Sequence, residues 1–266
     1  MKAFFLPVDD GRRFCVYHGA GESPRGAFVY VHPFAEEMNL SRRMAALQAR
    51  ALAAAGHAVL QIDLFGCGDS DGDFGEADWE TWIRDVAAAA DWLREETGQE
   101  VALWGLRAGC LLAVEAARAM RVPPRRFLFW QPVLSGETCW RQFMRLQLTA
   151  GLVAGQVADA GAQCRDDEGR PIEVAGYRLS SGLADGLRAA RFDLPTTDGE
   201  IVCVEAGGSG ESLSPGLAAG IEAWRQAGWR IRSAAVKGDA FWLIPETGDC
   251  DALLAATADL LGGKAS

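Results

Sequence analysis

The sequence predicts an α/β fold in which a mostly parallel sheet of eight strands, the first two antiparallel, carries helices on both faces. Short apolar runs alternate with longer amphipathic segments along most of the 266 residues, which is typical of consecutive β–α–β units. With 49% hydrophobic and 23% charged residues, the chain can bury one large core. One apolar run also leads straight into Gly105-Leu106-Arg107-Ala108-Gly109 and an Ala-rich helix, so a sharp turn follows a buried strand.

Each expected strand is a short apolar run, and each expected helix is a longer amphipathic segment. Asp9-Asp10-Gly11 predicts a hairpin turn between the first two strands. Ser41 is a residue type that caps helices, so we expect the first helix to begin there. The strands are expected at 3–8, 13–17, 26–32, 57–64, 101–104, 126–131, 200–206 and 229–236, and the helices at 41–55, 78–96, 108–120, 215–227 and 250–261.

The alternation of strand and helix stops between 133 and 195. Apolar residues there recur at helical spacing, for example at Trp140 and Phe143. A segment of this length is too long for a loop inside a compact domain. We therefore predict one α/β core made of residues 1–132 and 196–266, with a small helical cap at 133–195 inserted after the sixth strand.

Charge and cysteine content argue against several classes of function. A net charge of −10 and a pI near 4.9 disfavour nucleic acid or an anionic membrane surface as the main partner. The seven cysteines include no C-x-x-C pair, as in a cytoplasmic protein with reduced thiols. The sequence has neither a signal-peptide pattern nor an apolar run of about 20 residues, so we expect a cytoplasmic chain without a membrane span.

Residues 105–109 have the spacing of a nucleophile elbow, in which G-x-S-x-G lifts a serine above a strand-to-helix turn. The central residue here is Arg107. A guanidinium group stays protonated at any ordinary pH and cannot attack a carbonyl carbon. The sequence therefore predicts where a site lies, without its usual nucleophile.

Several motifs resemble those of the α/β-hydrolase superfamily over nearly the full length. They are HPF at 32–34, DLFGCGDS at 63–70 and the elbow at 105–109. A narrower resemblance, to exosortase A system-associated hydrolase 2, is carried by WGLR at 104–107, VAGYRLS at 174–180 and GDAFW at 238–242. This resemblance implies a protein that accompanies bacterial exopolysaccharide and PEP-CTERM sorting systems, and it implies an arginine at the elbow as a family feature.

The catalytic triad of this superfamily is incomplete in the sequence. The chain order in this fold is nucleophile, acid, histidine, with the histidine after the last strand. All three histidines, His18, His32 and His57, precede the elbow. Asp239-Ala240-Phe241 stands where the base is expected, and the loop at 207–211 stands where the acid is expected. Because loss of a nucleophile or base lowers the rate by several orders of magnitude, we expect no serine-esterase activity.

The backbone of the expected site can still bind a ligand. In this fold the oxyanion hole uses N–H groups, here those of Phe34 and Ala108, which survive any side-chain change. The adjacent helix N-terminus favours anions. Arg107 therefore needs either an acidic side chain or an anionic ligand, and its fork fits carboxylate or phosphate. The candidate internal partners are Glu36, Glu37, Asp69, Glu211 and Asp239.

Other residues near the expected site suit structural roles. His32 is expected to orient the oxyanion loop by hydrogen bonding. Ser70 suits a Gly-Asp-Ser turn, and Cys110 suits helix packing as an inert thiol. Trp140 and Trp242 are the tryptophans expected near the pocket. We expect no metal and no cofactor.

Two classes of function follow, besides a purely structural role in which Arg107 closes an inactive pocket through a buried ion pair. The first is a hydrolase-like protein of an exosortase system that lacks serine chemistry and binds an anionic or acyl small molecule, or another protein of that system. The second is an active hydrolase or transferase, in which Asp239 or Glu37 activates water while Arg107 and the two backbone donors hold an oxyanion. The binding residues expected are His32, Phe34, Glu37, Ala108 and Trp242.

Overall fold

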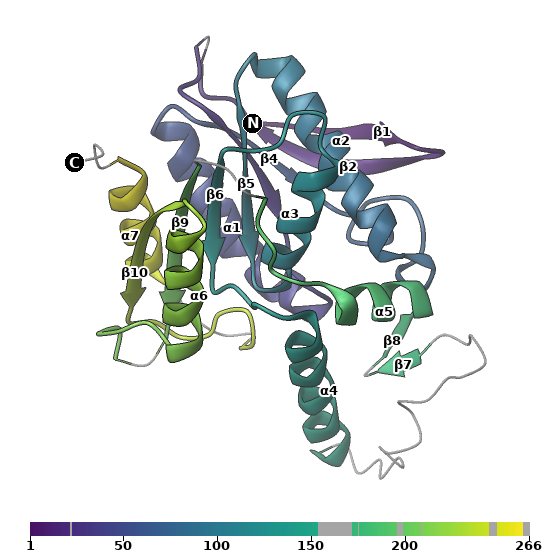
Figure 1. Cartoon of the computed structure of the whole chain (residues 1–266). Helices are drawn as coiled ribbons and strands as arrows, with labels where there is room; N and C mark the ends of the chain where they lie inside the picture. The colour runs from purple at the N-terminus through teal and green to yellow at the C-terminus, as the bar shows by residue number, and fades with distance from the viewer. Residues whose placement is uncertain are drawn as a thin grey trace.

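An eight-stranded sheet runs through the middle of the computed structural model and carries helices on both faces (Figure 1). The structure describes residues 1–21, 23–153, 172–174, 176–195, 199–207, 209–244 and 249–262. Within these residues, no helix is long and apolar enough to cross a membrane.

The strand order of the main sheet is β1-β2-β4-β3-β5-β6-β9-β10. Strand β1 pairs with β2, and β2 with β4, in antiparallel fashion, whereas every other neighbour pair is parallel. The predicted sheet is thereby confirmed. The strands are β1 (Lys2–Val8), β2 (Gly11–His18), β3 (Ala27–Val31), β4 (Ala58–Ile62), β5 (Val101–Leu106), β6 (Arg126–Trp130), β9 (Glu200–Ala206) and β10 (Arg230–Val236).

Helices α1 (Glu36–Ala54) and α7 (Asp251–Gly262) cover one face of the sheet. Helices α2 (Trp79–Thr97), α3 (Ala108–Ala119) and α6 (Pro215–Gln226) cover the other. Every residue of the central strands β3 and β5 is buried, because a parallel sheet is apolar on both faces. The carboxyl end of β5 therefore emerges from a rigid core, next to the N-terminus of α3.

The predicted start of the first helix is wrong. Ser41 does not cap α1, which begins five residues earlier at Glu36. The Ser41 side chain is buried inside the helix and donates a hydrogen bond to the carbonyl oxygen of Met38. The chain instead turns sharply at Ala35 (φ 50°, ψ −130°), so that two glutamates occupy the first turn, where the helix dipole favours negative charge.

The predicted insertion contributes helices α4 (Gly136–Val153) and α5 (Ser181–Ala189), with a two-stranded hairpin of β7 (Ile172–Val174) and β8 (Tyr177–Leu179) between them. The hairpin was not predicted, and residues 154–171 of the insertion lie outside the described residues. Helix α4 extends from the end of the sheet at which β5 and β6 finish (Figure 1). The insertion therefore borders the elbow.

Glycines at both ends of the elbow allow backbone segments to approach closely. A Cβ atom on Gly109 would lie 2.2 Å from the carbonyl oxygen of Val31, and one on Gly105 would lie 2.7 Å from Cα of Cys110. Both contacts are with backbone atoms, which cannot move aside as a side chain can. The turn therefore requires glycine at 105 and 109, because any side chain there would collide with backbone atoms.

We predict that Gly109→Ala destabilises the protein by about 2 kcal/mol or more, because α3 must move away from β3. Gly216→Ala in α6 is the control, since a Cβ there meets no atom within 4 Å, and it should change stability by less than about 1 kcal/mol. Urea unfolding measures both free energies. Equal stabilities of the two variants would contradict the packing argument.

Candidate functional site

Arg107 occupies a strained turn between β5 and α3. Its backbone has φ 55° and ψ −120°, a region that costs a non-glycine residue about 1–3 kcal/mol and marks functional sites in many proteins. The Arg107 N–H donates to the carbonyl oxygen of Trp130 at 3.0 Å, which fixes the turn to β6. The structure thus has the backbone of a nucleophile elbow, with an arginine at its apex.

A second turn of the same kind faces the elbow. Ala35 has nearly the same backbone angles as Arg107, and it leads from Phe34 into α1. Phe34 and Ala108 are both buried. Their N–H groups take part in no hydrogen bond among the described residues. Two backbone donors thus remain available beside the elbow, as in an oxyanion hole.

The guanidinium group of Arg107 is held by three side chains from three parts of the chain. Nε donates to Oε1 of Glu37 at 3.3 Å, and Nη2 donates to Oε1 of Gln142 at 2.9 Å. The guanidinium carbon also lies 5.7 Å from the ring centroid of Trp242, within cation–π range. The insertion, through Gln142 on α4, therefore contacts the elbow residue directly.

Glu37 is an uncommon carboxylate because it is largely buried and only one of its two oxygens has a hydrogen-bond partner. The Glu37 and Arg107 side chains are 16% and 13% exposed. Burial raises the pKa of Glu37, and the charge and hydrogen bond of Arg107 offset part of this rise. The second oxygen of Glu37, Oε2, has no hydrogen-bond partner. The preceding Glu36 instead accepts a hydrogen bond at 2.6 Å from the hydroxyl group of Tyr177 on β8.

These groups line a cavity of about 280 Å³. Its polar lining comes from α1, the elbow and α4, and its apolar lining includes Trp242 and Leu243, the second of which is 40% exposed. This combination of a few polar groups and a mainly apolar wall is typical of small-molecule pockets. The lining residues are Phe34, Glu36, Glu37, Leu40, Arg107, Cys139, Gln142, Phe143, Trp242 and Leu243.

None of the histidines contacts Arg107. The His32 ring is buried, with Nδ1 at 2.8 Å from the carbonyl oxygen of Pro33 and Nε2 accepting from the N–H of Leu64 at 3.3 Å. This pattern requires the neutral tautomer with the proton on Nδ1, and burial lowers the pKa of His32 accordingly. His32 thus joins the loops after β3 and β4, and its ring does not line the Arg107 cavity.

Asp239 lies away from the elbow cavity. Its side chain is exposed on the loop after β10 and does not line the cavity. Its carbonyl oxygen accepts a hydrogen bond from the N–H of Phe241. Asp69 and Glu211 are likewise exposed. Of the five expected partners of Arg107, the structure selects Glu37, because the early start of α1 points its first turn at the elbow.

Three further side chains that could act as nucleophiles, one serine and two cysteines, have structural contacts or buried thiols instead. The Ser70 hydroxyl donates to the carbonyl oxygen of Asp63 at 2.5 Å and accepts from the N–H of Phe14 at 2.8 Å. Cys110 is fully buried, and burial raises the pKa of its thiol well above the usual value. Cys139 lines the cavity, but burial raises its pKa to about 12. Both thiols are therefore protonated at neutral pH and poor nucleophiles.

Comparisons with known proteins agree on the fold. The family model described as serine aminopeptidase, S33, matches residues 22–163. Est1E from Butyrivibrio proteoclasticus, solved with ferulic acid bound, is 16% identical over 98% of this chain and 100% of its own, with a TM-score of 0.65. The α/β-hydrolase GrgF from Penicillium sp. sh18 is 17% identical over 98% and 97% of the two chains, with a TM-score of 0.64. A search of curated proteins finds no significant match.

We predict that Arg107→Met destabilises the protein by about 3 kcal/mol, because the carboxylate of Glu37 is left buried without its partner. The double variant Arg107→Met/Glu37→Met should recover most of this loss, which a double-mutant cycle in urea detects. Arg84→Met is the control, since its pair with Asp9 is about half exposed and is expected to contribute less than about 1 kcal/mol.

The cost of Arg107→Met should also depend on pH. The pKa of Glu37 is raised in the folded protein, and removing the arginine raises it further. Protonation of Glu37 therefore stabilises the folded variant at low pH. This contribution to the free energy of unfolding is lost as the pH rises through the folded-state pKa of Glu37. The loss of stability should therefore be larger at pH 8 than at pH 5. A loss that is equal at both pH values would show that Glu37 is not the group left unpaired.

Proposed function

Since this chain belongs to the serine aminopeptidase S33 family of α/β-hydrolases, we propose that it retains the ligand pocket of that fold without the serine chemistry. In this proposal, the cavity at the elbow binds a small molecule through an anionic or acyl oxygen. The observation that carries the proposal is the position of Arg107, at the apex of the strained turn and inside the cavity.

Loss of serine chemistry is supported by the residues that surround the apex. A guanidinium group has no electron pair to offer a carbonyl carbon. The sequence contains no histidine after His57, and the rings of His18 and His32 are held by Gln61 and by the oxyanion loop. The side chains next to Arg107 are therefore unable to activate a serine in the usual way.

Ligand binding is supported by the hydrogen-bond donors around the cavity. The N–H groups of Phe34 and Ala108 are unpaired among the described residues, and a ligand oxygen could accept from both. The amide nitrogen of Gln142 donates to no acceptor among the described residues, while its oxygen accepts a hydrogen bond from Arg107. Because Glu37 already compensates the charge of Arg107, an acyl or carboxyl oxygen fits this site better than a bare inorganic anion does.

The cellular setting belongs to the same proposal. The motifs at 104–107, 174–180 and 238–242 support a place among proteins of a bacterial exosortase and exopolysaccharide system, with a protein of that system as a partner. A cytoplasmic location is supported by the cysteines, since the six within the described residues are free thiols.

An unusual hydrolase or transferase is the second candidate, and Glu37 is the observation that favours it. A buried carboxylate with a raised pKa and one unpaired oxygen is suited to exchange a proton with water. Arg107 and the two backbone N–H groups would stabilise the oxyanion that forms. Asp239 is less suited to this role, because its side chain is exposed outside the cavity.

We predict that Arg107→Ser does not create esterase activity, because a serine at the apex still lacks a histidine. Wild type and Arg107→Ser should both resist labelling by a fluorophosphonate probe and leave p-nitrophenyl acetate unhydrolysed above the background rate. An active serine hydrolase treated in parallel verifies the probe. Labelling of the wild-type chain at any serine would contradict the proposed loss of serine chemistry.

A series of straight-chain carboxylates and their methyl esters tests the proposed binding. A ligand at a hundredfold excess over its dissociation constant stabilises the folded state by about 2.7 kcal/mol, so the melting temperature of the wild type should rise by several degrees. Arg107→Lys keeps the charge but loses the planar fork, and it should abolish most of this rise. Turnover of the esters by the wild type, lost in Glu37→Gln, would favour the second candidate instead.

A further inference from the structure

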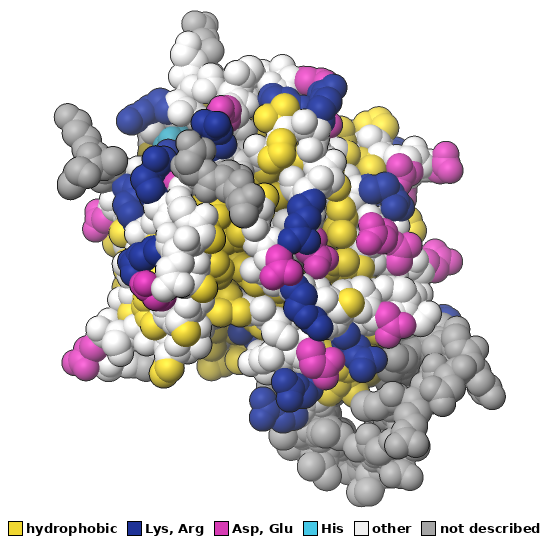
Figure 2. Space-filling model, viewed as in Figure 1, with side chains coloured by type: hydrophobic (Ala, Val, Ile, Leu, Met, Phe, Trp, Pro, Cys, Tyr) yellow, Lys and Arg dark blue, Asp and Glu magenta, His cyan; other side chains and the backbone are white. Residues whose placement is uncertain are grey.

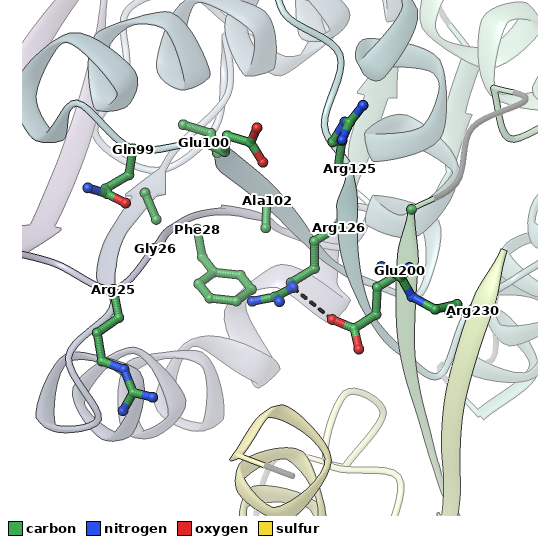
Figure 3. Close-up of a pocket in the computed structure, with 13 residues that line it drawn as sticks. Arg25, Gly26, Phe28, Gln99, Glu100, Ala102, Arg125, Arg126, Glu200 and Arg230 are labelled. Atoms are coloured by element: carbon green, nitrogen blue, oxygen red, sulfur yellow. Dashed lines mark ion pairs between the residues drawn. The ribbon is translucent and has the colours of Figure 1, made fainter. Parts of the chain in front are cut away.

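The wall of the elbow cavity consists mainly of aromatic and aliphatic side chains. Within its volume of about 280 Å³ the lining includes three aromatic rings, those of Phe34, Phe143 and Trp242. A pocket of about 520 Å³ at the opposite end of the sheet is lined by one aromatic ring and by charged side chains, among them the ion pair of Arg126 with Glu200 (Figure 3). Of these two cavities, the one at the elbow suits an aromatic ligand.

Charges on the surface give a ligand little guidance towards the elbow. Figure 2 shows basic and acidic side chains close together across the middle of one face, with apolar atoms between them. At the elbow itself, the charge of Arg107 is compensated by Glu37. Opposite charges that lie close together largely cancel at a distance. A ligand of the elbow cavity is therefore selected by its contacts inside the cavity.

The aromatic rings of the wall are held in place by ring–ring contacts. The ring of Phe34, which follows β3, meets the ring of Phe143 on α4 with centroids 5.0 Å apart and planes at 89°. The ring of Trp242, which follows β10, meets that of Phe241 with centroids 5.0 Å apart and planes at 83°. Both are favourable edge-to-face arrangements. A ligand therefore meets a wall that is already ordered, which lowers the entropic cost of binding.

The space beside these rings is narrow. Phe34 and Trp242 line the cavity, yet the two residues are only 3% and 4% exposed. Since water reaches so little of either ring, the adjoining gap admits only a thin group. A planar aromatic ring is thinner than a saturated ring with the same number of carbons, and it can also pair with the rings of the wall. The shape of the wall thus favours a flat aromatic group.

The polar end of the cavity lies next to the aromatic wall. The guanidinium carbon of Arg107 is 5.7 Å from the ring centroid of Trp242. A carboxyl group at Arg107 therefore places a ring against the aromatic wall when a short linker joins the two groups. Since one water takes about 30 Å³ in the liquid, the cavity of about 280 Å³ has room for a single ring and such a linker.

We propose that the elbow cavity selects a short carboxylic acid that carries one aromatic ring, or the acyl group derived from that acid. The ring lies against Phe34, Phe143 and Trp242, and the carboxyl or acyl oxygen lies at Arg107. A favourable ring–ring contact contributes a factor of about 2 to 10 in affinity beyond the burial of apolar area. This inference rests on the function proposed above, since it requires a carboxyl or acyl oxygen at the elbow.

The test is calorimetric titration of the full chain with 3-phenylpropanoate, 3-cyclohexylpropanoate and hexanoate. The first two acids share the linker and the carboxyl group and differ only in the ring. The saturated ring is the more apolar of the two, so burial of apolar area alone favours the cyclohexyl acid. We expect the opposite order, with a dissociation constant for the phenyl acid at least about threefold lower than for the cyclohexyl acid.

The variant Phe143→Leu locates the aromatic contact. It keeps an apolar side chain at a half-buried position but removes a ring from the wall. The preference for the phenyl acid should fall at least about twofold, and the dissociation constant of hexanoate should change by less than about twofold. Phe5→Leu on β1 is the matched control, because Phe5 is 46% exposed and lies outside the cavity, and it should leave the preference unchanged.

The outcomes separate this inference from the proposed function. A cyclohexyl acid that binds at least as tightly as the phenyl acid would overturn the inference, whereas binding of hexanoate would leave the proposed function standing. Absence of binding by all three acids would contradict the proposed function as well. A preference for the phenyl acid that persists in a folded Phe143→Leu would place the ring elsewhere and also overturn the inference. The comparison in the wild type decides the matter even where that variant does not fold.

Discussion

The buried contact between the guanidinium group of Arg107 and the carboxylate of Glu37 determines what the elbow site can do. Arg107 itself occupies a strained strand-to-helix turn. Glu37 closely follows a second such turn, at Ala35. The two turns hold the side chains against each other in a setting where both are less than one-fifth exposed. The pair compensates its own charges, so in the proposed function the N–H groups of Phe34 and Ala108 share the recognition of a ligand oxygen with the planar guanidinium group of Arg107.

The site has the backbone geometry of a nucleophile elbow but an arginine in place of the nucleophile. Glycines at 105 and 109 keep the close approach of α3 to β3 and β5, and the N–H groups beside the turn stay unpaired within the described residues. No histidine contacts Arg107 at the apex, and His32 joins two loops in its neutral form. Preorganised backbone donors bind an oxygen whether or not a nucleophile stands next to them, which is why the proposed function keeps ligand binding without serine chemistry.

The sequence was sufficient to predict the sheet and the elbow, because both depend on local patterns: apolar runs, helical periodicity and glycine spacing. It misplaced the start of α1, because the capping preference of Ser41 was outweighed by the turn at Ala35, which depends on packing. The same error hid the partner of Arg107, since Glu37 reaches the elbow only from the first turn of that helix. Gln142 was missed because the part of the insertion around it carries no motif.

Nuclear magnetic resonance of the Arg107 side chain tests the central claim most directly. The N–H at Nε is hydrogen bonded to Glu37 and the side chain is only 13% exposed, so its signal should exchange slowly with water and disappear in Arg107→Lys. Titration with hexanoate should shift this signal to saturation, as expected for a carboxyl group bound at the elbow. A signal that exchanges as fast as those of exposed arginines, or that stays in place while hexanoate binds elsewhere, would contradict the account.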